Sequence, residues 1–201
     1  MPRFLTSWFP AAAGFAALAG VAFTAPAQAV PLVSGNFITF GDTTVTIEDC
    51  TGLCGNGELV ASGGSFLFDK LGGGGGAMLN VGEDISVFLE VTTTGHDIMN
   101  IALSATGTGN ASVGETAFDN QLCGIGSGTA QVGAGTTSIP LTYPGSGVGC
   151  SDNLRDIFIS KDMSANDGSI FTVSQSVPEP AGVAALAVGM LGLFWMRRRS
   201  A

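Results

Sequence analysis

The segment Ile85–Thr94 limits the fold more than any other stretch of the chain, because apolar and polar residues alternate along it. The positions expected to face a core are Ile85, Val87, Leu89 and Val91, and those expected to face solvent are Ser86, Glu90 and Thr92. Successive side chains of a β-strand point to opposite faces of its sheet. The segment therefore predicts a strand with one buried face and one exposed face.

Shorter segments with the same alternation recur from residue 36 to residue 175. The further predicted strands are Asn36–Phe40, Thr43–Glu48, Ser65–Asp69, Ile98–Ser104, Thr136–Tyr143, Arg155–Ser160 and Ser169–Gln175. Clusters of Gly, Asn, Asp and Ser separate them, and no long stripe has the 3.6-residue period of a helix. Seven to nine short strands favour an all-β fold, a single antiparallel β-sandwich of jelly-roll or immunoglobulin-like type.

The predicted strands are joined by two kinds of connection. Gly95–Asp97 is short enough to join its two flanking strands as a hairpin, which would leave His96 exposed at the tip. Gly72–Gly76, Gly107–Gly114 and Gly124–Gly135 are rich in glycine, and we expect them to be flexible loops. The first of these lacks the Lys-Ser/Thr and the helix start of a phosphate-binding loop.

The first 29 residues have the pattern of a secretory signal peptide. One basic residue, Arg3, precedes an apolar stretch that runs to Phe23, and Ala27-Gln28-Ala29 follows. This order predicts a signal helix that is cleaved after Ala29. The alternative is an N-terminal helix that is retained. With cleavage, the body of the protein is residues 30–176, a length that suits one domain.

The C-terminal residues 177–201 fall into three parts with different physical properties. Pro178 and Pro180 restrict the backbone, and Glu179 lies at a helix start, where negative charge is favoured. Residues 181–196 form an uncharged apolar run that predicts a transmembrane helix about 24 Å long, slightly short of a hydrocarbon core about 30 Å thick. Arg197–Arg199 would stop transfer and stay on the cytoplasmic side.

This tail resembles the PEP-CTERM sorting signal of Gram-negative bacteria in its Val-Pro-Glu-Pro motif, short helix and arginine cluster. The resemblance implies a membrane-embedded exosortase as partner, an inner-membrane anchor in the precursor, and cleavage near the motif. It also implies export to the cell surface or to an exopolysaccharide matrix. In that family the residues recognised would be Pro178, Glu179 and Pro180, and the stop would be Arg197, Arg198 and Arg199. The alternative is an ordinary anchor that is not cut.

Charge and cysteine content describe the environment of the body. Its basic residues are Lys70, Arg155 and Lys161, against fifteen acidic ones, which gives a net charge of −12 and argues against nucleic-acid binding. The exported body holds four cysteines, Cys50, Cys54, Cys123 and Cys150, for which disulfides are the expected state and three connectivities are possible. We favour Cys50–Cys54 and Cys123–Cys150, since these partners are nearest in sequence. The spacing does not suit a zinc site.

Few residues suggest chemistry. His96-Asp97 lacks the surroundings of a hydrolase triad, so we expect no catalytic site, no cofactor and no enzyme activity. Several acidic and amide side chains could supply calcium ligands, namely Asp152-Asn153, Asp156, Asp162 and Asn166-Asp167-Gly168. The last group is equally typical of an ordinary hairpin turn, and we assign no metal site. Most phenylalanines of the body fall at alternating strand positions, which is typical of a core; this weakens a sugar-binding platform without excluding it.

These observations favour a non-enzymatic exported protein of the cell surface or exopolysaccharide matrix, with a structural or adhesive role. The alternative is a carbohydrate- or calcium-binding sandwich in the same matrix. A secreted hydrolase is a third reading, for which the sequence shows no supporting motif.

A C-terminal tag tests the sorting hypothesis. In a host with an exosortase, the mature protein is expected to lose a tag fused after Ala201, because cleavage near Pro178–Pro180 separates it from the body. In the same host without exosortase the tag should remain, which immunoblotting of cell fractions would detect. A tag that stays attached in the exosortase-containing host contradicts the hypothesis.

Overall fold

The computed structural model describes residues 28–62, 64–142, 150 and 153–177, which include nearly all of the predicted body. These residues form twelve β-strands and one short 3-10 helix, and they confirm the predicted all-β, antiparallel, two-sheet sandwich. The strands are β1 (Ala29–Pro31), β2 (Phe37–Phe40), β3 (Thr43–Gly52), β4 (Gly57–Ser62), β5 (Ser65–Lys70), β6 (Glu83–Thr93), β7 (Asn100–Thr108), β8 (Ser112–Asp119), β9 (Gly124–Gln131), β10 (Thr137–Pro140), β11 (Asp156–Ala165) and β12 (Ser169–Ser176). The helix, η1, is Cys54–Asn56.

The predicted transmembrane helix, residues 181–196, and all but two residues of the predicted signal peptide lie outside the described residues. Within the described part, no helix has the length and apolar character needed to cross a membrane.

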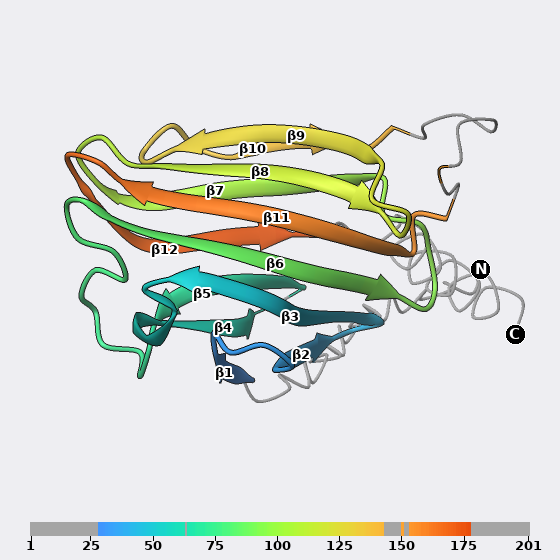
Figure 1. Cartoon of the computed structure of the whole chain (residues 1–201), viewed down its shortest axis with the longest axis horizontal. Coiled ribbons are helices and arrows are strands. Elements are labelled where there is room, and N and C mark those ends of the chain that lie inside the picture. Colours follow the sequence, from blue (N-terminus) through green and yellow to red (C-terminus); the bar gives the residue numbers. More distant parts are fainter. Residues whose placement is uncertain (1–27, 63, 143–149, 151–152, 178–201) are drawn as a thin grey trace, which may run out of the picture.

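The two sheets have six strands each and lie face to face (Figure 1). Sheet A has the order β1-β4-β5-β12-β7-β10, and sheet B has the order β2-β3-β6-β11-β8-β9. From β5 to β12 the chain passes between the sheets at every connection except that from β8 to β9. The resulting four-strand orders, β5-β12-β7-β10 and β6-β11-β8-β9, are those of a jelly roll rather than an immunoglobulin domain. The first four strands widen both sheets on the same side.

The predicted hairpin across Gly95–Asp97 is wrong. β6 pairs with β3 and β11 in sheet B, whereas β7 pairs with β12 and β10 in sheet A. The loop between them carries the chain from one sheet to the other, at the right-hand end in Figure 1. A short connection suits this crossing as well as a hairpin, so its length could not distinguish the two.

The strand count predicted from the sequence is too low, because β1, β4, β8 and β9 were not recognised. β9 lies within the glycine-rich stretch that we expected to be a loop, and Gly126 and Gly128 face Ile139 of the opposite sheet. A Cβ added at Gly128 would lie 2.6 Å from the Ile139 side chain, and one added at Gly126 would lie 2.8 Å from Leu141. These glycines allow the sheets to approach closely at this edge.

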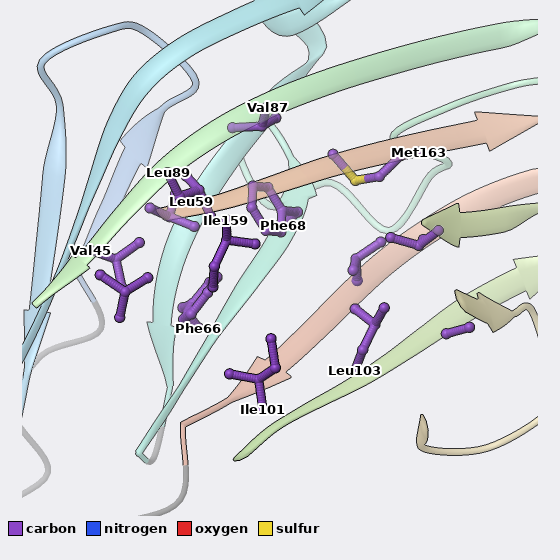
Figure 2. Close-up of a cluster of buried hydrophobic side chains, with 14 of the residues drawn as sticks. Val45, Leu59, Phe66, Phe68, Val87, Leu89, Ile101, Leu103, Ile159 and Met163 are labelled. Atoms are coloured by element: carbon purple, nitrogen blue, oxygen red, sulfur yellow. The ribbon is translucent and has the colours of Figure 1, made fainter. Parts of the chain in front are cut away.

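Apolar side chains from both sheets form one continuous core. Figure 2 shows Phe66 and Phe68 of β5 together with Ile159 of β11 in this layer. Phe66 and Phe68 pack edge to face, with ring centroids 5.9 Å apart. Ile85, Val87, Leu89 and Val91, predicted to face inward, are all buried. The alternation in β6 therefore places its residues as the sequence predicts.

Two disulfides tie surface segments to this core, and they are the two pairings favoured from the sequence. Cys50–Cys54 joins the end of β3 to η1, and Cys123–Cys150 joins the β8–β9 turn to the segment between β10 and β11. Their sequence separations are 4 and 27 residues, so the second constrains the unfolded chain more strongly.

Replacing each pair by serines should separate their contributions to stability. Loss of Cys123–Cys150 is expected to lower the free energy of unfolding by about 3 kcal/mol, and loss of Cys50–Cys54 by about 2 kcal/mol, because the longer loop loses more entropy on closure. Urea denaturation of the two double variants measures both values. If removing Cys50–Cys54 lowers the free energy of unfolding more than removing Cys123–Cys150 does, chain entropy does not determine which disulfide stabilises the protein more.

Candidate functional site

The outer face of sheet B carries the most distinctive set of side chains in the described residues. On β11 the outward positions include Phe158, Ser160 and Asp162, because their neighbours Ile157, Ile159, Lys161 and Met163 are buried in the core. β8 and β6 present outward residues by the same alternation. The strand register sets these residues in rows that cross the sheet.

Three successive rows define the candidate site. The first is Glu90–Phe158–Phe118–Gly124, the second is Phe88–Ser160–Thr116–Ser127, and the third is Ser86–Asp162–Gly114–Thr129. Each row takes one residue from β6, β11, β8 and β9 in turn. Neighbouring rows are two residues apart along β6, β11 and β8, so they lie roughly 6.8 Å from one another. On β9 a register shift sets the first two rows three residues apart, at Gly124 and Ser127.

The second and third rows enclose a shallow groove with a volume of about 300 Å³, which we call the outer groove. The outward residues that line it are Gly114, Thr116, Ser127, Thr129, Ser160 and Asp162. Gly114 lies between Asp162 and Thr129 and has no side chain to fill the space. The groove is therefore lined by hydroxyl groups and one outward carboxylate, and it is hollow at Gly114 because this residue has no side chain.

Phenylalanines form an apolar patch beside the outer groove. Phe88 and Phe158 stack with their ring centroids 5.5 Å apart and an interplanar angle of 4°, and Phe118 lies directly across from Phe158 in the strand register. All three are half-buried. The assignment of the phenylalanines to the core is wrong for these three, although it holds for Phe66 and Phe68.

The sequence does contain the signal for this patch. Phe88 is in phase with Ser86 and Glu90, which were predicted to face outward, and Phe158 is in phase with Ser160. An aromatic residue at an outward position of a strand points away from the core even though it is hydrophobic, because successive side chains point to opposite faces of the sheet. Phe118 could not have been found this way, because β8 was not recognised as a strand.

Hydrogen bonding and charge shape the two ends of the site. At one end, Ser86 Oγ donates to Asp162 Oδ1 at 2.9 Å, which orients that carboxylate beside the outer groove. At the other end, burial raises the pKa of Glu90, and the negative charges of Asp156 and Glu48 raise it further. One oxygen of Asp156, Oδ1, is buried without a hydrogen-bond partner among the described residues. The site is therefore acidic beside its phenylalanine patch.

The shifted pKa of Glu90 predicts a pH-dependent stability. A carboxyl whose pKa is higher in the folded state stabilises the fold below its ordinary pKa, and this contribution is lost as the pH rises through the folded value. Glu90→Gln is therefore expected to raise the melting temperature at neutral pH, and the gain should disappear in acid. Thermal denaturation across this pH range measures the difference.

Glu58→Gln is the matched control, because Glu58 lies on the outer face of sheet A and its replacement lowers the negative charge of the protein equally. An equal gain in both variants, or a gain for Glu90→Gln that persists in acid, would contradict the local origin of the effect.

The residues considered as calcium ligands are spread along the molecule. Asp156 begins β11 and Asp162 lies in its middle, while Asn166-Asp167-Gly168 forms the turn between β11 and β12. Asp162 faces the outer groove, and the Asp167 N–H donates to the Asn110 carbonyl in the turn. Asp152 lies outside the described residues. The part of the set that the structure describes is not brought together into one ligand cage, because β11 is extended over ten residues.

Asp119 approaches the Cys123–Cys150 disulfide closely, and it acts as a structural group. Its Oδ1 accepts hydrogen bonds from the N–H groups of Gln121, at 2.9 Å, and Cys123, at 2.8 Å. Both cysteine sulfurs are consumed in the disulfide, so they are not available as thiolate ligands. The carboxylate fixes the β8–β9 turn directly after Phe118.

His96 is largely buried, which corrects the expectation that it is exposed. Its side chain is 9% exposed, and Nδ1 lies 3.0 Å from Asp42 Oδ2. Thr93 Oγ1 donates to the His96 carbonyl, and the Arg155 guanidinium pairs with Asp97 at 3.0 Å. These contacts hold the β6–β7 crossing loop against neighbouring segments.

The structure places only part of the predicted processing sites. Ala29, the predicted cleavage position, lies in β1 opposite Val60 of β4. The sorting residues Pro178, Glu179, Pro180 and Arg197–Arg199 lie outside the described residues. Signal cleavage and sorting stay predictions.

No protein-family model matches the sequence, and no curated protein matches it either. Among solved structures, the chain is similar to TmCBM61 in complex with β-1,4-galactotriose, with 12% identity, a TM-score of 0.39, and 65% of this chain and 88% of that chain covered. It is also similar to a structure described for the promiscuous specificity of carbohydrate-binding modules of the β-sandwich superfamily, with 10% identity, a TM-score of 0.34 and coverages of 69% and 56%.

A third similar structure is the family 11 carbohydrate-binding module of a cellulosomal cellulase of Clostridium thermocellum. The identity is 11%, the TM-score is 0.26, and 75% of this chain and 83% of that chain are covered. At these identities and TM-scores the similarities carry no weight for function.

Proposed function

We propose that this protein is an exported adhesive component of a cell-surface or exopolysaccharide matrix, and that its β-sandwich binds a carbohydrate at the outer groove. The observation that carries the proposal is the row arrangement on sheet B, where a phenylalanine patch adjoins a groove lined by hydroxyl groups and a carboxylate. Adhesion and carbohydrate binding are then one role, since the bound sugar would hold the protein in its matrix.

The chemistry of the face suits a sugar ring. The C–H faces of a sugar are apolar and pack on aromatic rings, whereas its hydroxyl groups need donors and acceptors at fixed positions. Phe118 and Phe158 offer the first surface, and Thr116, Ser160 and Asp162 offer the second in the next two rows. A short sugar chain that contacts all three rows would run along β8 and β11, because successive rows are two residues apart on these strands.

Charge selects among carbohydrates. Asp162 lies in the outer groove, and the pKa of Glu90, raised by burial and by Asp156 and Glu48, reflects a field that disfavours added negative charge at the aromatic end. A uronic-acid or sulfated polymer would add to this repulsion. We therefore propose a neutral polysaccharide as the ligand.

The export route is the second part of the proposal. The signal peptide and the PEP-CTERM-like tail support it from the sequence, and both disulfides of the folded body suit an oxidising compartment. An exosortase-type protease and the inner membrane would be the partners of the precursor. The folded body would be the part that reaches the matrix, and it would act there without catalysis.

Phe158→Ala tests the binding face. The variant should bind a panel of neutral polysaccharides about tenfold more weakly than the unchanged protein, since losing one aromatic contact costs about 1.4 kcal/mol. Affinity electrophoresis of the purified protein in gels that contain each polysaccharide measures the retardation.

Phe171→Ala is the matched control, because Phe171 belongs to β12 of sheet A and is 39% exposed. It should bind like the unchanged protein. Equal loss in both variants, or no retardation of the unchanged protein by any neutral polysaccharide, would refute carbohydrate binding at the outer groove. Circular dichroism of both variants verifies that the fold is retained.

A further inference from the structure

Three polar side chains occupy the layer between the sheets, where every neighbouring inward position is apolar. Lys161 of β11 is 0% exposed, Glu115 of β8 is 3% exposed, and Gln175 of β12 is 0% exposed. Lys161 alternates with Ile159 and Met163, and Glu115 alternates with Val113 and Ala117, so the parity of each strand turns these side chains inward.

The three side chains meet at the carboxyl group of Glu115. Lys161 and Glu115 are directly opposite each other on neighbouring strands of sheet B, and Lys161 Nζ contacts Glu115 Oε2. From sheet A, Gln175 Nε2 donates to the other oxygen, Glu115 Oε1, at 2.9 Å. The ring of Phe68 covers the amine, with its centroid 5.7 Å from Nζ.

An ordinary ion pair is poorly supported at this position. An ammonium group has three N–H donors, and within the described residues the hydrogen bond found for Lys161 Nζ is that to Glu115. Gln175 Oε1 is buried without a hydrogen-bond partner among the described residues. Removing two charges from water is strongly unfavourable unless further hydrogen bonds compensate.

The same surroundings favour the uncharged amine of Lys161. Burial lowers the pKa of Lys161, and the neighbouring Glu115 opposes this effect. Transfer of one proton within the pair gives a free amine beside an uncharged carboxylic acid, with no net change of charge in the core. A free amine is a nucleophile, and a carboxylic acid in contact with it is its electrophile.

We propose that Lys161 and Glu115 become joined by an intramolecular isopeptide bond between Nζ and Cδ. The amine attacks Cδ, and the new N–C bond forms as the carbonyl electrons move to Oε1. The C–Oε2 bond then breaks, and this oxygen leaves as water with its own proton and one from Nζ. The products are a secondary amide and one water molecule, so no oxidant or other reactant is needed.

Gln175 has a defined part in this step. Its Nε2–H group points at Glu115 Oε1, the oxygen on which negative charge develops in the tetrahedral intermediate. Phe68 and the rest of the apolar layer exclude bulk water from the amine. The reaction needs the folded arrangement, because residues 115, 161 and 175 come from three strands and both sheets.

The cross-link would give the sandwich a third covalent tie, placed in its core rather than at its surface. It would join β8 and β11, which are neighbouring strands in the interior of sheet B, and would remove the charge pair from the core. The outer groove lies on the opposite face of the same two strands. The proposal is independent of what the outer groove binds.

Peptide mapping of the full chain from an exporting Gram-negative host tests the proposal. The denatured, reduced and alkylated protein is digested with trypsin and Glu-C, which cleave after lysine or arginine and after glutamate. The bond should block cleavage after both Lys161 and Glu115. Mass spectrometry should find the two peptides joined, with the mass of their sum less one water.

Internal controls are present in the same digest, since Arg155 directly precedes β11 and Glu90 lies on β6, which pairs with β11, and cleavage after both residues should be complete. Separate peptides cleaved after Lys161 and Glu115 would overturn the proposal. So would a cross-link to Gln175, which would be recognised by the loss of one ammonia in place of water. These results come from the unchanged protein and do not depend on a variant that folds.

Two variants test the assigned roles. Lys161→Met keeps a long side chain without an amine and should give only separate peptides. Gln175→Leu removes the donor to Oε1 and should leave a larger fraction of the protein uncross-linked after the same time. A joined peptide in Lys161→Met would contradict the assignment of the amine, and an unchanged cross-linked fraction in Gln175→Leu would contradict the role of Gln175.

Discussion

The layer between the two sheets is the constraint on which the rest of this structure depends. Each sheet has one apolar face, and the packing of these two faces against each other removes both from water. From β5 to β12 the chain crosses between the sheets at every connection except that from β8 to β9, so segments of the two sheets are interleaved along the chain. The glycines of β9 and the phenylalanines of β5 adjust the thickness of this layer at its two sides.

A buried polar cluster interrupts that layer, and it is costly unless its groups are satisfied. Lys161, Glu115 and Gln175 lie among residues whose contribution is purely apolar. Unpaired polar groups in such surroundings destabilise a fold by about 1–3 kcal/mol each. A covalent amide between the amine and the carboxyl would lower this cost by replacing two charges with one neutral group.

The outer face of sheet B follows from the same alternation as the core, because each outward residue lies between two inward residues of its strand. Every inward residue of β8 and β11 fixes an outward neighbour, so the positions of Phe118, Phe158 and Asp162 follow from the burial of the residues between them. The β8–β9 turn, held by Asp119 and the Cys123–Cys150 disulfide, steadies the end of the strand that carries Phe118. Stability and the proposed binding surface are therefore built from the same strands.

The sequence by itself determined the all-β class and the residues of the longest strand that face inward, because these depend on period-two alternation. It left three disulfide connectivities open and only favoured the one that the structure has, in which each cysteine pairs with its nearest neighbour along the chain. It also contained the parity of Phe88 and Phe158, which a stricter use of alternation would have placed outside. The order of the strands, the crossing loop at His96 and the strand hidden in Gly124–Gly135 were decided only by the tertiary structure.

The physical reason is that these features depend on the opposite sheet. The glycine-rich segment can be a strand because its glycines leave room for the side chain of Ile139 in the opposite sheet. The short loop after β6 crosses between the sheets because the next strand, β7, belongs to the other sheet. The meeting of Lys161, Glu115 and Gln175 is of the same kind. Sixty residues separate Glu115 from Gln175 along the chain, and only the packing of sheet A on sheet B brings the two side chains within hydrogen-bonding distance.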